Sequence, residues 1–126
     1  MKMQHVTILT KYFDEEIKFY EDYAGLKIVR DMRPHMDLVF LADGPEETKV
    51  EIIRNPEAEG SGNQFISMGF GTDDAEMLRE EYIAKGLETT ELISPNPHVK
   101  FFYVKDPAGR VPRASSLTSL LLAPSP

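Results

Sequence analysis

The first residues of the chain alternate between apolar and polar side chains, as a half-buried β-strand does. In the segment 5–10, HVTILT, Val6 and Ile8 share one face, whereas His5 and Thr7 share the opposite face. The alternation predicts a short strand with one face toward a core and the other toward a more polar environment.

An amphipathic helix is predicted directly after this strand, over residues 14–24. Apolar residues recur there at three-to-four spacing, Asp14 is suited to the N-cap, and Gly25 is suited to a left-handed helix stop. Three β-runs follow around turns that contain proline or glycine, at residues 27–33, 37–42 and 48–54. The first half of the chain is therefore predicted to be β-α-β-β-β.

The second half repeats this order after a polar, glycine-containing linker. It is predicted to form a strand at 65–72, a helix from Asp73 or Asp74 to Gly86, a strand at 87–93, a loop at 94–97 and a strand at 99–105.

Aligned offsets indicate that the two halves are copies of one unit. His5–Thr10 aligns with Ser67–Thr72 at an offset of 62 residues, and Pro34–Asp43 aligns with Pro97–Asp106 at an offset of 63. We therefore predict an α+β fold in which residues 1–126 form one domain of two tandem βαβββ modules. Module one covers residues 3–55 and module two covers residues 64–113. The linker between them is 56–63, and an atypical tail follows at 114–126.

The repeat breaks down after Gly109. A strand like Lys49–Ile53 should follow, but residues 110–116 show no strand pattern and include Pro112, which would remove a ladder donor. The last strand of module two is therefore in doubt. Since residues 114–126 carry no charged side chain, we interpret this tail as a departure from the ancestral ending, such as a shifted reading frame would cause. A natural divergent tail is the alternative.

Composition indicates an ordinary globular protein and argues against some partners. The chain has 126 residues, of which 41% are hydrophobic and 28% charged, so it can bury a substantial core. Its formal net charge of −7 argues against nucleic acid or an anionic membrane as a partner. It has no cysteine and no apolar run long enough to span a membrane, so we expect a cytoplasmic protein.

Three segments carry a family resemblance: IKFYEDYAGL at 17–26, GFGTDD at 69–74 and VKDPAG at 104–109. Together with the opening His-Val-Thr-Ile, they resemble the glyoxalase, bleomycin-resistance and extradiol-dioxygenase superfamily, also called vicinal oxygen chelate proteins. The resemblance implies paired modules whose mixed sheets curve into a cup, often completed or paired through a homodimer. Members include metal-dependent lyases, isomerases and dioxygenases, thiol transferases and metal-free drug-binding proteins.

The resemblance implies a metal site at His5 and Glu51. In metal-dependent members each module gives one ligand from its first strand and one from its last, and these two residues match both positions of module one. Imidazole and carboxylate suit zinc, nickel, iron or manganese. Glu51 could also exchange between ligand and general base, which makes it the candidate catalytic residue. The alternative is an inherited polar pair that lines a metal-free cup.

Module two departs from this ligand pattern. Ser67 stands in place of His5, and the counterpart of Glu51 falls at Pro112, Arg113 or Ala114, depending on the offset. None of these residues replaces an imidazole or a carboxylate, so any divalent metal would have an incomplete ligand set and weak affinity.

The other candidates would contact a small organic molecule. Thr7 and Ser67 lie on the first strands of the two modules, and Phe101 and Tyr103 share one strand face, from which they could stack on a planar ligand. Core packing is the alternative for the two rings.

Arg30 and Arg33 are three residues apart, so a regular strand places them on opposite faces. Either could hold a carboxylate, and a solvated strand edge is the alternative.

Two functions remain open at this point, and so does the question of whether the chain is an enzyme. One is a glyoxalase-like, metal-dependent lyase or isomerase that acts on a substrate with vicinal oxygens. The other is a metal-free protein that binds a drug or an aromatic ligand. In both cases the partner is a small organic molecule, and we expect a homodimer.

Overall fold

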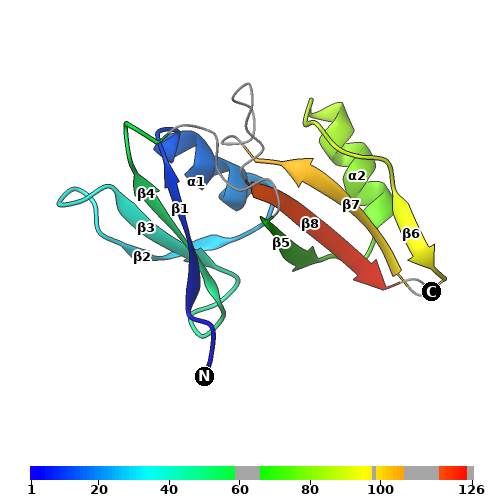
Figure 1. Cartoon of the computed structure of the whole chain (residues 1–126), viewed down its shortest axis with the longest axis horizontal. Coiled ribbons are helices and arrows are strands. Elements are labelled where there is room, and N and C mark those ends of the chain that lie inside the picture. The colour runs from blue at the N-terminus through cyan, green and yellow to red at the C-terminus, as the bar shows by residue number, and fades with distance from the viewer. Residues whose placement is uncertain (59–65, 98, 107–116, 125–126) are drawn as a thin grey trace. The chain divides into compact units, whose positions relative to one another are not determined.

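The structure is a computed structural model that describes residues 1–58, 66–97, 99–106 and 117–124 (Figure 1). The chain divides into two compact units, Met1–Glu59 and Gly60–Pro126. Each unit contains a four-stranded mixed sheet and a helix in the order β-α-β-β-β. The predicted α+β class is therefore confirmed.

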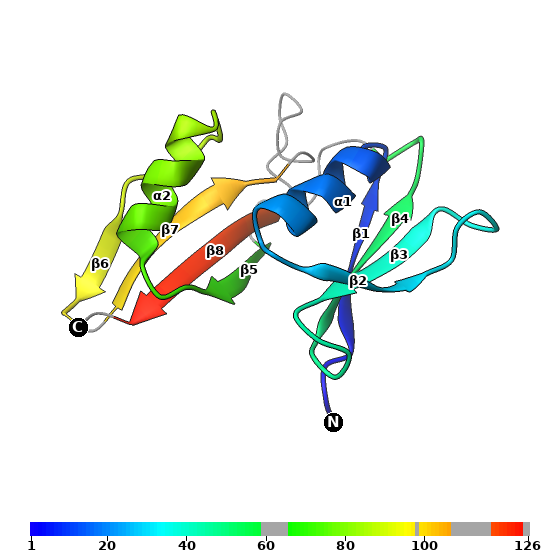
Figure 2. The same cartoon turned by 180° about the vertical axis from the view of Figure 1, so that it is seen from behind.

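The first unit pairs its first strand with its last. It consists of β1 (His5–Thr10), α1 (Phe13–Asp22), β2 (Lys27–Asp31), β3 (Leu38–Ala42) and β4 (Lys49–Arg54). The strands lie in the order β1-β4-β3-β2, with β1 and β4 parallel and the other neighbours antiparallel (Figures 1 and 2). Side chains from the two ends of this unit can therefore meet on one face of the sheet.

The helix α1 packs against β3 and β4 and covers one face of this sheet (Figure 2). Val39, Leu41 and Ile52 are fully buried there, as is Tyr20 from the helix, and Ile17 of the helix is 6% exposed. Burial of this apolar surface is the main force that holds the unit together. Because side chains alternate along a strand, the residues between these positions lie on the opposite face, which we call the open face of the first sheet.

The helix α1 begins and ends earlier than the sequence predicts. It spans Phe13–Asp22 rather than 14–24, and its N-cap is Tyr12 rather than Asp14. The backbone N–H of Tyr12 donates a hydrogen bond of 2.9 Å to the Thr10 hydroxyl, which fixes the turn from β1 into the helix.

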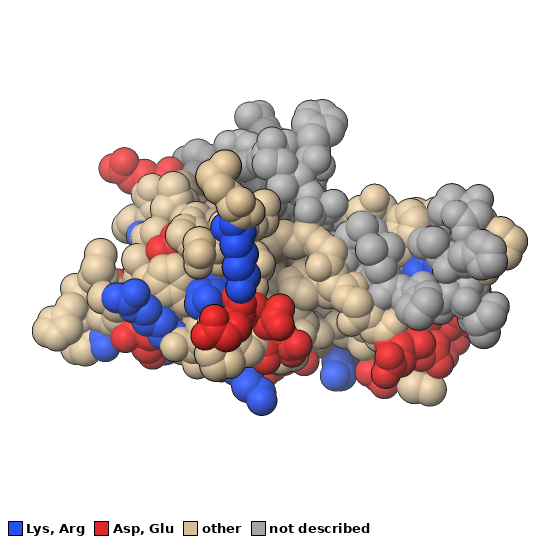
Figure 3. All heavy atoms as spheres, turned by 90° about the horizontal axis from the view of Figure 1, so that it is seen from below, with Lys and Arg blue, Asp and Glu red and all other residues tan. Residues whose placement is uncertain are grey.

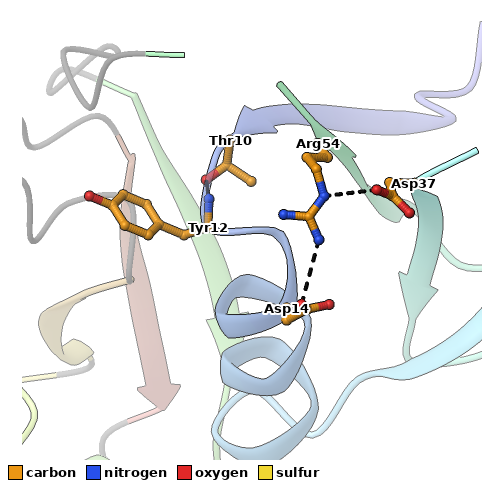
Figure 4. A network of polar contacts seen from close by, with 5 residues as sticks. All are labelled: Thr10, Tyr12, Asp14, Asp37 and Arg54. Carbon is orange, nitrogen blue, oxygen red and sulfur yellow. Dashed lines mark hydrogen bonds and ion pairs between the residues drawn. The ribbon is translucent and has the colours of Figure 1, made fainter. Parts of the chain in front are cut away.

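Arg54 at the end of β4 ties the start of α1 to the sheet (Figure 4). Its Nε donates to the Asp37 carboxylate at 2.8 Å, and its Nη2 lies 3.5 Å from the Asp14 carboxylate. The guanidinium also lies 5.0 Å from the centre of the Phe13 ring. Asp14 therefore lies inside the first turn of α1, where it pairs with Arg54 instead of capping the helix.

The second unit has the same strand order as the first. It consists of β5 (Ile66–Gly71), α2 (Ala75–Ala84), β6 (Ile93–Asn96), β7 (Val99–Lys105) and β8 (Leu117–Pro124). These strands lie in the order β5-β8-β7-β6, with β5 and β8 parallel. Asp74 caps α2 by accepting a hydrogen bond of 3.0 Å from the Met77 N–H, as one of the two predicted caps. Gly25 and Gly86 have φ of 69° and 83°, so both predicted left-handed stops are present.

The predicted strand at 87–93 is wrong in position. The strand β6 lies at Ile93–Asn96, most of which the sequence predicts as loop. Of the described residues between α2 and β6, only Thr89 forms a β-bridge. Thr90 instead donates its N–H to the Tyr103 carbonyl at 3.0 Å and accepts the Tyr103 N–H at its hydroxyl, also at 3.0 Å. These two hydrogen bonds between Thr90 and Tyr103 take the place of regular strand pairing between the predicted strand and β7.

The last strand of the second unit is present, contrary to the expectation that the strand pattern ends near Gly109. The strand β8 lies between β5 and β7, parallel to the first and antiparallel to the second. It comes later than predicted because 11 residues, 106–116, separate it from β7, whereas six residues, 43–48, separate β4 from β3. A longer connection, rather than a missing strand, breaks the repeat.

The register of β8 identifies the counterpart of Glu51. In the first unit Glu51 pairs with Thr7 and with Phe40. The residues at the corresponding positions of the second unit are Gly69 and Tyr103, and both pair with Leu120. Two ladders therefore agree that Leu120 takes the place of Glu51. The predicted counterparts Pro112, Arg113 and Ala114 are wrong for this register, and they lie outside the described residues.

Candidate functional site

His5 and Glu51 meet on the open face of the first sheet. Val50 and Ile52 are buried on the helix side of β4, so Glu51 between them lies on the opposite side. His5 lies on the same face from β1, and its Nε2 is 3.5 Å from the Glu51 carboxylate. The parallel pairing of β1 and β4 thus joins the two residues that the sequence singles out.

Thr7 completes this polar cluster. Its hydroxyl donates a hydrogen bond of 2.6 Å to Oε1 of Glu51, the same oxygen that faces His5. The side chain of Glu51 is 12% exposed and that of His5 is 42% exposed. Glu51 is therefore a shielded carboxylate held by the hydrogen bond from Thr7, with His5 beside it on the solvent side.

Phe40 and Arg30 extend the cluster across the sheet. The Phe40 ring on β3 meets the His5 ring edge to face, with centroids 5.7 Å apart. The guanidinium carbon of Arg30 on β2 lies 6.0 Å from the centre of the Phe40 ring. Sequence reasoning does not single out Phe40, although it aligns with Tyr103 at the offset of 63, which is the signal that could have found it.

Phe101 and Tyr103 share a face of β7, as predicted. Their rings lie nearly perpendicular, with centroids 5.7 Å apart. Phe102 and Val104 between them are buried, and Phe102 contacts Tyr82 of α2. Phe101 and Tyr103 therefore lie on the sheet face away from α2, where both remain partly exposed.

Among the described residues of the second unit, nothing matches the imidazole and carboxylate of His5 and Glu51. Ser67 aligns with His5 in the repeat, and its side chain is not among those that the structure describes. Leu120, at the position of Glu51, has no side-chain atom that can bind a metal. Within the part of the chain that the structure describes, no three His, Cys, Asp or Glu side chains form a group that could hold a metal ion. His5 and Glu51 alone leave most positions of a divalent ion to water, so these residues do not fit a tightly bound resident metal.

Charged side chains of both signs lie on the face that Figure 3 shows, and the basic side chains coloured there do not form a continuous patch. Among the described residues, no helix is long and apolar enough to cross a membrane.

A model of the Glyoxalase/Bleomycin resistance protein/Dioxygenase superfamily matches residues 2–111. The chain belongs to this superfamily. Its members include metal-dependent glyoxalases and proteins of fosfomycin and bleomycin resistance, and they commonly use divalent metals and bind small molecules. The resemblance carried by the sequence motifs is thereby confirmed.

The chain is also similar to individual proteins. The chain is 30% identical over 118 residues to the uncharacterized protein YwbC of Bacillus subtilis (strain 168), a match that covers 86% of this chain and 91% of the relative. The trypanothione-dependent glyoxalase I of Leishmania major has a TM-score of 0.75 at 22% identity, covering 98% of this chain and 86% of that one. The fosfomycin resistance protein FosX of Listeria monocytogenes has a TM-score of 0.74 at 12% identity, covering 98% and 93%. At these identities, the two solved structures show a shared fold.

Proposed function

We propose that this protein binds a small organic molecule on the open face of its first sheet, without a resident metal. The observation that carries the proposal is the replacement of Glu51 by Leu120 in the second unit, on which two strand ladders agree. The open face of the first sheet combines an aromatic ring, Phe40, with a few fixed polar groups. That combination is typical of ligand-binding sites that select by shape and hydrogen bonding.

The side chains of the open face support this role. Phe40 offers an aromatic surface beside His5, and Glu51 offers an acceptor that Thr7 holds in place. A ligand with a flat apolar body and one hydrogen-bond donor would satisfy both groups. In this role Glu51 acts as a binding residue, and no proton transfer is required of it.

The first test uses a neutral planar probe, methyl 4-aminobenzoate, whose amine can donate to Glu51. We expect Glu51→Gln to weaken its binding about tenfold, because the variant loses a charged acceptor of a hydrogen bond. Glu21→Gln removes an exposed carboxylate from α1 and serves as the control, with no change expected. Titration calorimetry gives both dissociation constants. Equal affinity of the wild type and the Glu51 variant would contradict the proposal.

A second candidate function is a glyoxalase-like lyase or isomerase that depends on a divalent metal. The 3.5 Å approach of His5 to Glu51 favours it, because one imidazole and one carboxylate on adjacent strands are a suitable beginning of a metal site. Zinc, nickel, iron or manganese held there would supply a Lewis acid for vicinal oxygens of a substrate.

Metal analysis of the purified protein separates the two candidates. The binding proposal predicts metal well below one ion per chain, with the same content in His5→Ala and Glu51→Ala. One ion per chain that disappears in both variants would establish the second candidate instead.

Three further expectations belong to this proposal. We propose that the chain forms a homodimer, as superfamily members often do, and that it works in the cytoplasm, where a chain without cysteine needs no oxidising conditions. Phe101, Tyr103 and the hydroxyl of Ser67 are proposed as contacts for a small molecule bound on the second unit by itself.

A further inference from the structure

We infer that the ligand of the proposed site is a planar acid, whose anionic group binds Arg30 while a donor group at its other end meets Glu51. This inference rests on the proposed function, because it assigns a ligand class to the same face. It adds one residue, Arg30, as the determinant of specificity.

Strand register places four residues of the open face in one row. Thr7 pairs with Glu51, Glu51 pairs with Phe40, and Phe40 pairs with Arg30, so each strand of the first sheet contributes one member. Residues in register across a sheet lie on the same face, with about 4.8 Å between neighbouring strands. The row therefore runs from a carboxylate, past an aromatic ring, to a guanidinium, with about 10 Å between the backbone positions of Glu51 and Arg30.

Arg30 and Arg33 differ in what already holds them. Arg33 donates to both oxygens of the Asp31 carboxylate, at 2.9 and 2.7 Å. Within the described parts of the chain, no side-chain hydrogen bond or ion pair engages the guanidinium of Arg30, which lies over the Phe40 ring. The Phe40 ring orients the guanidinium that lies against it. The N–H groups of the guanidinium stay free to donate to a planar oxyanion.

The opposite signs at the two ends fix the direction of the ligand. A carboxylate is attracted to Arg30 and repelled by Glu51, whereas an amine or hydroxyl donor is suited to Glu51 alone. The flat body between them would lie beside Phe40. A molecule with an acid at one end and a donor at the other therefore matches the row, and its neutral ester matches only half of it.

The experiment compares 4-aminobenzoate with its methyl ester on the same variants. Both probes are titrated into ¹⁵N-labelled protein, and the amide chemical shifts of Thr7, Phe40 and Glu51 give the dissociation constants. The same spectra report whether each variant is folded. The variants are Arg30→Gln, the charge-conserving Arg30→Lys, and the control Arg33→Gln, which removes an arginine that Asp31 already engages.

The acid is expected to bind the wild type about tenfold more tightly than the ester, and Arg30→Gln is expected to abolish that difference. Arg30→Lys should recover part of it, and Arg33→Gln should leave it unchanged. Equal binding of acid and ester to the wild type, or equal losses in the Arg30 and Arg33 variants, would overturn the inference while the proposed function stands. Failure of both probes to shift the amides of Thr7, Phe40 and Glu51 would overturn the two together.

Discussion

Asp31 at the end of β2 and Arg33 beyond it form a close ion pair of two parallel contacts. The side-chain hydrogen bonds from Arg33 lower the pKa of Asp31 from 3.8 to about 2. Since the folded pKa lies below the unfolded one, the pair stabilises the fold above about pH 4, and this contribution is lost as the pH falls toward about 2.

This titration is the first residue-scale prediction. NMR titration of the Asp31 carboxyl should give a pKa near 2 in the wild type and a value returned toward 3.8 in Arg33→Gln. Arg30→Gln should leave the Asp31 pKa in place, because Arg30 makes its described contact with Phe40 instead. An unchanged pKa in the Arg33 variant would show that the pair does not persist in solution.

Two leucines of the first sheet test which face is the core. Leu41 is fully buried under α1, whereas Leu9 is 55% exposed on the open face. Leu41→Ala should lower the free energy of unfolding by about 2–5 kcal/mol, because it leaves a cavity in a packed interior. Leu9→Ala should change it by no more than about 0.5 kcal/mol. Urea denaturation measures both, and similar losses at the two positions would contradict the assignment of faces.

At the scale of the elements, β8 is the strand that the sequence misses. Its neighbours β5 and β7 follow from hydrophobic pattern and β-propensity, and the helix stops at Gly25 and Gly86 follow from backbone chemistry. The repeat does not predict the position of β8. It predicts a strand directly after Gly109, whereas β8 begins at Leu117, because more residues separate β8 from β7 than separate β4 from β3. The strand β6 begins later than predicted for a different reason. Hydrogen bonds between Thr90 and Tyr103 hold the segment before β6 beside β7.

Proline substitution tests the interior position of β8. Leu120 pairs with both Gly69 and Tyr103, so Leu120→Pro should remove a ladder donor from a central strand and abolish cooperative unfolding of the second unit. Leu117→Pro, at the first residue of the strand, should be tolerated far better. Hydrogen exchange at the amides of Phe102 and Val104 follows the effect, because the Tyr103 N–H points away from β8 and donates to the Thr90 hydroxyl. Equal tolerance of both prolines would show that β8 does not occupy the centre of its sheet.

At the scale of the whole molecule, the chain consists of two β-α-β-β-β units that have diverged in chemistry. The two units have the same strand order, which agrees with the aligned offsets, and strand alternation brings His5 and Glu51 onto one face. Sequence reasoning could not find the row with Phe40 and Arg30, because register across four strands depends on long-range pairing. The module boundaries, the role of each site residue and the shifted reading frame proposed for the tail stay predictions.

The most direct measurement of the central claim is an amide chemical-shift map of the protein titrated with methyl 4-aminobenzoate. Ligand binding on the open face predicts the largest shifts on β1, β3 and β4, at Thr7, Phe40 and Glu51, and about tenfold more probe to reach half of these shifts in Glu51→Gln. Shifts confined to α1 or to the second unit, or no shifts at all, would contradict the account.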